Sequence, residues 1–382
     1  MGGLAVVGYD RSGTVKSEMS GYISHGPILR PVMPELDSIR GLAILGVLFY
    51  HGFYWKIDLT TFPLWQGRIL NLASSGRMGV NLFFVLSGFL ITGLLLDSCE
   101  LPHYYGRFYV RRAKRILPAY VAILGILALL RYPPAFLALS AAFLSNLTPL
   151  VGVAIAYPVL WSLAVEEHFY LAWPATVRHV SRAGLLTLCA VIILASPVLR
   201  FISFQTAHDF QFNNYTWNSA DGLACGAVVA ILLRMWKENR QYLRGLVAAS
   251  LVTASLLSPF AVMYRETAVG AAMQVVPWHA LFMGVLGAFL LIGTSHLKYL
   301  VHIPTLRFFG RISYGLYLVH LLVFDAFDRL VHWHALSGLA LRFCVSATAA
   351  IVLAWLSREY FEERFLRHHS RVSVTAVTTP SS

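Results

Sequence analysis

The sequence has few charged residues. Asp, Glu, Lys and Arg make up 13% of its 382 residues, about half of the roughly 25% that soluble domains carry. Hydrophobic residues reach 57%, and the mean hydropathy is +0.64. This composition indicates an all-α polytopic protein that resides in a lipid bilayer, with the helix bundle itself as its core.

Cysteines are scarce and unpatterned. The four are Cys99, Cys189, Cys225 and Cys344, and no two show the C-x-x-C spacing of zinc or redox sites. They mostly fall in or beside apolar runs. We therefore expect neither a disulfide framework nor a metal centre.

No second polar segment is long enough to fold by itself, so we expect one transmembrane domain over residues 31–370. Residues 1–30 are rich in Gly and Ser and lack the continuous apolar core of a signal peptide. We expect them to form a flexible cytoplasmic tail. Residues 371–382 are expected to be a disordered tail.

The formal charge of +12 would also fit a nucleic-acid partner, but the basic residues stand in short segments between apolar runs. That distribution is typical of cytoplasmic loops under the positive-inside rule. We therefore expect no nucleic-acid partner.

Ten apolar runs have spanning length, which is about 17–25 residues. They cover 36–55, 78–96, 116–132, 158–175, 184–203, 220–236, 245–263, 277–296, 311–331 and 337–357. With ten spans and both termini inside, the basic loops near 107–115 and 234–244 are cytoplasmic, and the loop 204–219, without Lys or Arg, is outside. If 135–150 also spanned, this charge bias would reverse. We therefore predict about ten transmembrane helices and interpret 135–150 as an outer re-entrant or interfacial segment.

Ionisable residues stand inside the first predicted span, LDSIRGLAILGVLFYHGFYW. Arg40 and His51 are eleven residues apart, so they share a helix face about 16 Å apart along the axis. Arg40 is predicted to lie near the cytoplasm. The alternative to a functional role is a structural one, in which its side chain only snorkels to the membrane interface or pairs with Asp37. His51 lies in the outer third, where it suits a proton acceptor. The alternative to this role is structural: a histidine that only packs against a neighbouring helix and hydrogen-bonds it.

Two further motifs carry charge into the membrane. In WSLAVEEHFYLAWP, Glu166 and Glu167 are adjacent and point about 100° apart, so we expect only one to face a shared site. Glu167 lies in the same half of the membrane as His51 and is expected to orient it.

In FYVRRAKRILPAY, Arg112 and Arg115 share a helix face. This pattern favours either a phosphate-binding site or a topological anchor at the cytoplasmic side of the membrane.

Polar residues also mark later spans. In RISYGLYLVH, Ser313, Tyr317 and His320 follow the i, i+4, i+7 spacing of one helix face, and Asp221 opens the sixth span. Earlier in the chain, GVNLFFVLSGFLIT places Ser87 and Gly88 in an apolar run. Small residues of this kind allow two helices to approach closely.

Five stretches in chain order resemble the membrane acyltransferase-3 family. They are LDSIRGLAILGVLFYH, GVNLFFVLSGFLIT, FYVRRAKRILPAY, WSLAVEEHFYL and ISYGLYLVH, between about residues 36 and 320. Arg40 and His51 match the family's Arg-x10-His motif, and Arg112 and Arg115 match its Arg-x-x-Arg motif. The chain departs from the family at three positions: His168 replaces the usual Gln, Ser219 a common Arg and Asn81 a frequent Asp.

The resemblance implies an O-acyltransferase that moves an acyl group, often acetyl, from cytoplasmic acyl-CoA to a hydroxyl. The acceptor would be a carbohydrate, a lipid-linked sugar or a secondary metabolite, in a bacterial inner (plasma) membrane. Arg40, Arg112 and Arg115 would bind acyl-CoA, and Asp221, Ser313, Tyr317 and His320 would bind substrate. His51 would act as the base with Glu167 or Glu166 beside it, unless an acyl-histidine forms.

A different class of protein also fits buried His and Glu residues. Proton-coupled transporters use such residues as relays, although no inverted repeat or pair of broken helices is evident here. The sequence leaves the acceptor, the acyl chain and the oligomeric state open, and a homo-oligomer is compatible with it.

Overall fold

Long helices dominate the fold, as the apolar runs predict. The computed structural model describes residues 28–30, 32–207, 214–264, 266–331 and 336–367, and within these ranges it contains helices and no strand. The predicted tail 371–382 and most of the tail 1–30 lie outside the described residues. The single-domain prediction stays a prediction.

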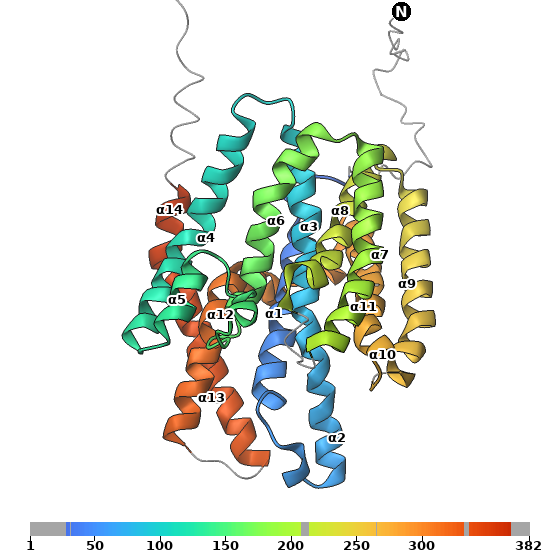
Figure 1. Ribbon diagram of the computed structural model, residues 1–382. Helices are drawn as coiled ribbons and strands as arrows, with labels where there is room; N and C mark the ends of the chain where they lie inside the picture. The colour runs from blue at the N-terminus through green and yellow to red at the C-terminus, as the bar shows by residue number, and fades with distance from the viewer. Residues whose placement is uncertain (1–27, 31, 208–213, 265, 332–335, 368–382) are drawn as a thin grey trace, which may run out of the picture.

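Ten helices of at least 18 residues form a bundle within the described ranges (Figure 1). They are α1 (Pro34–Phe53), α3 (Gly79–Ser98), α4 (Tyr104–Leu129), α6 (Leu160–His179), α7 (Arg182–Ala207), α8 (Thr216–Met235), α9 (Arg240–Met263), α11 (Val276–Gly293), α12 (Pro304–Leu330) and α13 (Leu336–Leu356). Each coincides with one predicted run, although α4 begins twelve residues earlier than 116–132.

Short elements connect the long helices. The α-helical ones are α2 (Leu64–Leu72), α5 (Pro134–Ala141), α10 (Ala268–Met273) and α14 (Glu363–Arg367), and the others are η1 (Leu59–Thr61), η2 (Ala73–Met78), η3 (Thr148–Val151), η5 (Lys298–Leu300) and the π-helix η6 (Ser357–Glu362). Segment 135–150 forms only α5, turns and the start of η3. Eight helical residues extend about 12 Å, too short to cross a bilayer.

Six helical segments of the described chain are both long and apolar enough to cross a membrane. They are Leu64–Ser98, Arg182–Thr206, Thr216–Met235, Arg240–Met263, Ala268–Gly293 and Leu336–Phe365. The predicted count of about ten is therefore not confirmed. Four more helices, α1, α4, α6 and α12, have 20 to 27 residues but are too polar to qualify. These four carry nine of the ten predicted site residues, so their polarity reflects the site.

Glycines allow the central helices to pack closely. A Cβ on Gly88 of α3 would collide with the backbone of Leu223 on α8, and one on Gly226 of α8 would collide with Val85. The pair α1 and α12 meets in the same way through Gly41 and Gly310. Close packing of this kind stabilises helix association in a membrane. Lipid tails are as apolar as a neighbouring helix, so the hydrophobic effect alone does not favour contact between helices.

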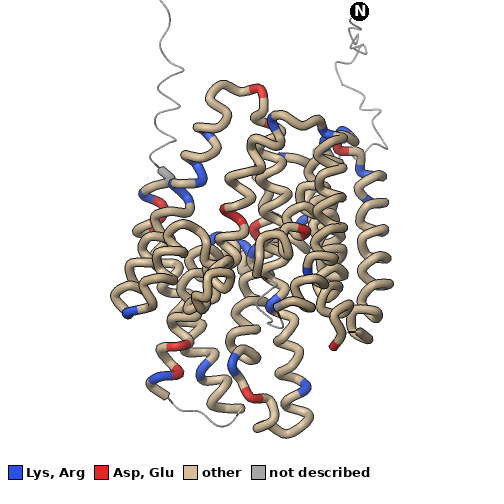
Figure 2. Tube along the Cα trace, in the orientation of Figure 1, with Lys and Arg blue, Asp and Glu red and all other residues tan. Residues whose placement is uncertain are grey.

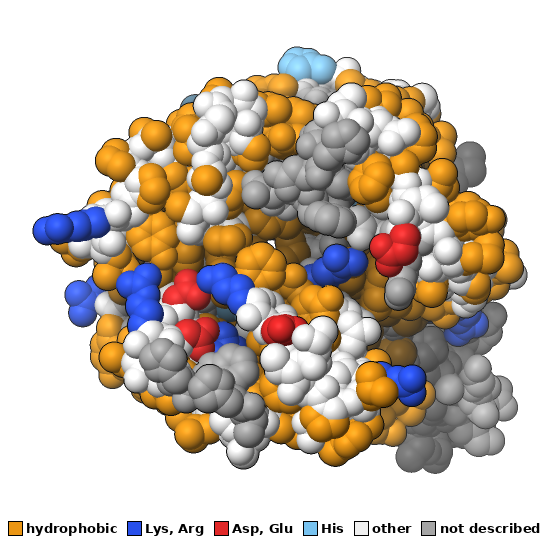
Figure 3. Space-filling view, turned by 60° about the horizontal axis from the view of Figure 1, so that its bottom comes forward, with side chains coloured by type: hydrophobic (Ala, Val, Ile, Leu, Met, Phe, Trp, Pro, Cys, Tyr) orange, Lys and Arg blue, Asp and Glu red, His pale blue; other side chains and the backbone are white. Residues whose placement is uncertain are grey.

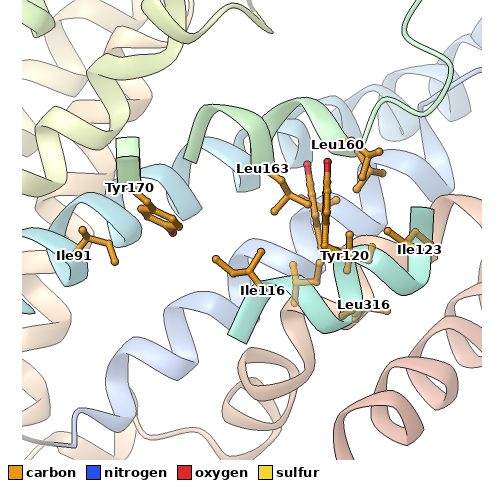
Figure 4. Packing of buried hydrophobic residues seen from close by; sticks show 14 of the residues in the cluster. Ile91, Ile116, Tyr120, Ile123, Leu160, Leu163, Tyr170 and Leu316 are labelled. Atoms are coloured by element: carbon orange, nitrogen blue, oxygen red, sulfur yellow. The ribbon is translucent and has the colours of Figure 1, made fainter. Parts of the chain in front are cut away.

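Burial separates central helices from peripheral ones. In the apolar windows of Leu64–Ser98 and Thr216–Met235, 61% and 72% of residues are buried, against 22% for Arg182–Thr206 and 17% for Arg240–Met263. Helices α7 and α9 accordingly lie toward one edge of the bundle in Figure 1, with α4, α5 and α14 toward the other. Figure 4 shows buried side chains of α3, α4, α6 and α12 converging, among them Ile91, Tyr120, Leu163 and Leu316.

The segment before α1 is attached to the bundle. Ile28 is 1% exposed, and the backbone N–H groups of Ile28 and Leu29 donate to Glu238, which follows α8. Arg30 pairs with the buried carboxylate of Glu35 and donates to the carbonyl oxygen of Gly293. These contacts tie the start of α1 to the ends of α8 and α11.

Candidate active site

Charged residues occur in the middle of the bundle as well as at its ends (Figure 2). A cavity of about 560 Å³ lies between α1, α3, α4, α6 and α12. Five arginines and three acidic residues line it, so the wall has a formal excess of at least two positive charges. The ionisable and hydroxyl-bearing side chains are Arg40, Ser87, Asp97, Ser98, Arg111, Arg112, Arg115, Ser162, Glu166, Glu167, Tyr170, Arg234, Ser313, Tyr314 and Tyr317.

The cavity collects the three arginines that the sequence analysis assigned to the donor. Arg40 comes from α1, and Arg112 and Arg115 come from one face of α4. Arg40 also pairs with Asp37 one turn earlier at 3.1 Å, which was the predicted structural alternative. Its pairing and its place in the cavity wall therefore occur together.

Aromatic rings orient Arg112. Its guanidinium carbon lies 5.6 Å from the ring centroid of Tyr170 and 5.8 Å from that of Phe108. Cation–π contacts of this kind hold a guanidinium without occupying its N–H donors. Arg112 is therefore positioned while its donors can bind an anion.

Both glutamates line the cavity, so the prediction that only one faces a shared site is wrong. Glu166 accepts hydrogen bonds from Ser87 on α3 at 2.8 Å and from Tyr170 at 2.9 Å. The prediction failed because it assumed a narrow site. This cavity extends from α3 to α4 and covers a wide sector of α6, so side chains about 100° apart both reach it.

Hydroxyl groups form one part of the cavity wall. The hydroxyls of Ser162 on α6 and Tyr317 on α12 are 2.7 Å apart, and Phe83 packs 6.4 Å from the Tyr317 ring. Ser313, one turn before Tyr317, donates to the carbonyl oxygen of Gly310 and also lines the cavity. Seven of the ten predicted site residues thus share one cavity.

His51 and His320 lie together beyond Tyr317. The His320 ring is 5.8 Å from the Tyr317 ring, and its Nε2 lies 3.2 Å from Nδ1 of His51. Neither histidine lines the cavity. Glu167 was expected to orient His51, but no hydrogen bond between them is found among the described residues. The structure instead places Nε2 of His320 next to Nδ1 of His51.

The backbone of His51 is held by a residue that the sequence analysis did not assign to the site. Arg342 of α13 donates to the carbonyl oxygens of His51 at 3.3 Å and Gly52 at 2.8 Å. It also forms a bidentate pair with Asp328 at 2.6 and 2.8 Å. Arg342 is 2% exposed. An arginine within an apolar run was the available signal, since buried cations need partners.

Asp221 lies apart from the cavity. It is 1% exposed and pairs with Arg200 of α7 at 2.9 Å and His279 of α11 at 3.3 Å. His279 in turn contacts Asn81 of α3 at 2.9 Å. These contacts join α8 to three neighbouring helices. Two departures from the family pattern, at Asn81 and Ser219, fall on or beside this buried network.

Metal ligands do not gather in the part of the chain that the structure describes: no group of three or more His, Cys, Asp or Glu residues there could hold a metal ion. The described side chains that come together here are an imidazole pair, next to the Tyr317 ring, and a cationic cavity with hydroxyl groups in its wall. Such an arrangement suits proton transfer to or from a hydroxyl near a bound anionic molecule.

Comparisons with known proteins identify the family of this chain. The profile of the acyltransferase-3 family, described as an acyltransferase domain, matches residues 33–359. Peptidoglycan O-acetyltransferase OatA of Listeria monocytogenes is 27% identical over 332 residues, which are 76% of this chain and 49% of the relative. Putative peptidoglycan O-acetyltransferase YrhL of Bacillus subtilis is 27% identical over 321 residues, 75% of this chain and 48% of the relative.

A putative O-acetyltransferase of Staphylococcus aureus is 25% identical over 378 residues, 87% of this chain and 57% of the relative. The chain thus spans about half the length of the curated relatives it matches. No solved structure matches it. The transporter interpretation finds no support in these comparisons. Its helices, the family profile and its relatives show that this chain is a multi-pass membrane acyltransferase that belongs to the acyltransferase-3 family.

Proposed function

We propose that this chain transfers an acetyl group from acyl-CoA to a hydroxyl of a cell-envelope carbohydrate. The observation that carries the proposal is the cavity with its cationic wall. Tyr317 lines this cavity, and its ring packs against His320 of the His51–His320 pair. The activity for which two relatives are named, O-acetylation of peptidoglycan, supports acetyl as the group and a glycan as the acceptor.

The shape of the site suits a donor with separated ends. Arg40 and His51 stand eleven residues apart on α1, about 16 Å along the helix axis. A molecule with phosphates at Arg40, Arg112 and Arg115 and a reactive carbonyl near His51 must therefore be long. Acyl-CoA has this form, since its phosphates and its thioester lie at opposite ends of an extended arm.

The acceptor enters, in this proposal, from the opposite end of the bundle. The C-terminal end of α1 leads from His51 to Lys56, which pairs with Asp325 of α12 at 3.2 Å. Figure 3 shows this end, where acidic and basic side chains gather beside a hollow. Tyr50 and Trp55 pack 4.8 and 5.9 Å from the His51 ring. Aromatic and polar groups together suit the apolar faces and hydroxyls of a sugar.

The proposed reaction is direct transfer. His51 removes the proton from the acceptor hydroxyl while its oxygen attacks the thioester carbonyl. The carbon–sulfur bond then breaks, and the CoA thiolate takes the proton from His51. The Tyr317 hydroxyl, which contacts Ser162 in the cavity wall, donates in this proposal a hydrogen bond to the carbonyl oxygen as negative charge develops there.

The sidedness belongs to the same proposal. The cavity extends to Asp97, Ser98 and Leu101 at the connection between α3 and α4, next to the basic start of α4. The positive-inside rule assigns that connection to the cytoplasm, where acyl-CoA is made available. Both termini then lie in the cytoplasm, and the protein lies in the inner membrane.

Purified protein with radiolabelled acetyl-CoA and a muropeptide or oligosaccharide tests this function. Label should appear in the acceptor as an alkali-labile ester, with one equivalent of free CoA released per ester. A label that reaches the protein but not an acceptor would favour an acyl-enzyme. An absence of CoA release with every acceptor offered, alongside intact folding, would contradict the proposal.

A further inference from the structure

The two buried histidines are linked by hydrogen bonds whose direction can be deduced. His320 is fully buried on α12, and its Nδ1 lies 3.1 Å from the carbonyl oxygen of Leu316 and 2.8 Å from that of Tyr317. A carbonyl oxygen only accepts hydrogen bonds. The Nδ1 of His320 therefore carries a hydrogen, and in the neutral ring its Nε2 has the free lone pair.

The same logic then fixes the protonation of His51. Its Nδ1 has two neighbours, Nε2 of His320 at 3.2 Å and the carbonyl oxygen of Val47 at 2.9 Å. Both neighbours are acceptors, so the hydrogen of neutral His51 resides on Nδ1. Because a neutral imidazole has one hydrogen, Nε2 of His51 is the nitrogen with the free lone pair.

We propose that His320 is a positioning residue that fixes the tautomer and ring orientation of His51, so that Nε2 is the atom that accepts the hydroxyl proton. The inference rests on the proposed role of His51 as a base. His320 then replaces the carboxylate that orients histidine in many hydrolytic triads. It is fully buried and does not line the cavity.

Proton movement is balanced in this arrangement. The acceptor hydroxyl gives its proton to Nε2 of His51, which becomes an imidazolium. Its Nδ1–H bond to His320 is then charge-assisted and stronger. When the thiolate leaves, the proton passes from Nε2 to sulfur. His320 ends each cycle with the proton with which it began.

A second contact distinguishes this arrangement from ordinary packing. Arg342, held by Asp328, binds the backbone carbonyl oxygens of His51 and Gly52. The α12 and α13 helices thus hold the ring and the backbone of one residue from separate directions. The contact with His320 of α12 limits rotation of the His51 ring about its side-chain bonds. The contact with Arg342 of α13 limits displacement of this end of α1.

Two substitutions at His320 separate positioning from packing. The amide oxygen of His320→Gln can accept from Nδ1 of His51, whereas His320→Leu fills similar space without an acceptor. We expect His320→Leu to reduce kcat about 10- to 100-fold, because Val47 still accepts from Nδ1, and His320→Gln to recover most of that loss. The KM for acetyl-CoA should change little in either variant. Equal activity of the two variants, or a more active Leu variant, would overturn the inference.

His279→Gln is the matched control. His279 is also a buried histidine, but it lies in the Asp221 network outside the cavity. Its kcat should stay within about threefold of the parent protein. A loss in this control as large as that in His320→Leu would assign both effects to general disturbance of the bundle and overturn the inference.

Nitrogen-15 NMR of histidine-labelled protein tests the tautomer without any turnover. The His51 signals are identified by their absence in His51→Gln. We expect a protonated Nδ1 and an unprotonated Nε2 in the neutral form, with the preference weakened in His320→Leu. A protonated Nε2 in the parent protein would overturn the inference. The expected tautomer in a protein without acyl transfer would instead count against the proposed function alone.

Discussion

Tyr170 donates a hydrogen bond to Glu166, four residues before it on α6, and its ring also lies beneath the guanidinium of Arg112. One side chain thus connects a carboxylate to a cation of the cavity wall. Ser87 of α3 is the second donor to the same carboxylate. The two donors account for a glutamate at this depth, and they make its charge rather than its size the property that matters.

Replacement of Glu166 by Gln should therefore impair the site despite its similar shape. An amide nitrogen cannot accept from Ser87 or Tyr170, and a hydrogen bond to a charged group contributes about 1.5–3 kcal/mol. We expect kcat/KM for acetyl-CoA to fall about 10- to 100-fold in steady-state assays. The exposed Glu359 of η6 supplies the control Glu359→Gln, which should remain active. Full activity of Glu166→Gln would remove this residue from the site.

Arg112 and Arg115 should determine affinity for the acyl donor. The double variant Arg112→Gln/Arg115→Gln removes two cations from the cavity wall, so we expect the KM for acetyl-CoA to rise at least tenfold with a smaller change in kcat. The exposed pair Arg107→Gln/Arg244→Gln changes the net charge equally outside the cavity. If both double variants raise KM alike, long-range charge rather than a binding site is responsible.

His51→Ala should abolish measurable transfer, because loss of a general base typically costs about 10²- to 10⁴-fold in rate. His51→Gln should fare little better, since an amide does not take up the proton. The control is His168→Gln, because His168 lies outside the cavity and hydrogen-bonds Thr216 at 2.7 Å and the backbone of Phe143, and a glutamine amide has both a donor and an acceptor for such bonds. The assay is acetyl transfer at equal amounts of membrane-inserted protein. Near-normal transfer by His51→Ala would refute the mechanism.

The proposed sidedness is tested by labelling of single cysteines in a background without the four native ones. Thr60 in η1 and Glu100 between α3 and α4 are both exposed. In intact spheroplasts, an impermeant maleimide should modify Thr60→Cys and not Glu100→Cys, and lysis should make both reactive. The reverse pattern would place the donor cavity toward the outside and exclude cytoplasmic acyl-CoA as its ligand.

Close packing of α3 against α8 should make Gly88 intolerant of a side chain. Gly88→Val would push the two backbones apart, and we expect a loss of more than about 3 kcal/mol, seen as a lower midpoint of thermal aggregation in detergent. Gly125 in α4 has no atom within 4 Å of an added Cβ. Gly125→Ala should therefore be neutral or slightly stabilising. A Gly88→Val protein as stable as the parent would contradict the packing described here.

The apolar runs predict helix positions well because a hydrophobic stretch long enough to cross a bilayer leaves the backbone little alternative to a helix. The local pair Asp37–Arg40 was predictable for a similar reason, since residues three apart share a face. The partners of His51 were not predictable. His320 and Arg342 follow it by 269 and 291 residues, and no periodic pattern records which faces of α1, α12 and α13 meet.

Leu29 and Met33 line the cavity, and the chain around them is fastened through Glu238 and Glu35. Under the proposed function, a purification tag joined close to residue 28 would therefore crowd the cavity that takes the acyl donor and weaken donor binding without any change in the catalytic groups. Expression vectors for kinetic work should place such a tag at the other end of the chain, or separate it from Ile28 by a long linker. Under the same proposal, antibodies or nanobodies raised against this short segment would act as inhibitors that compete with acyl-CoA.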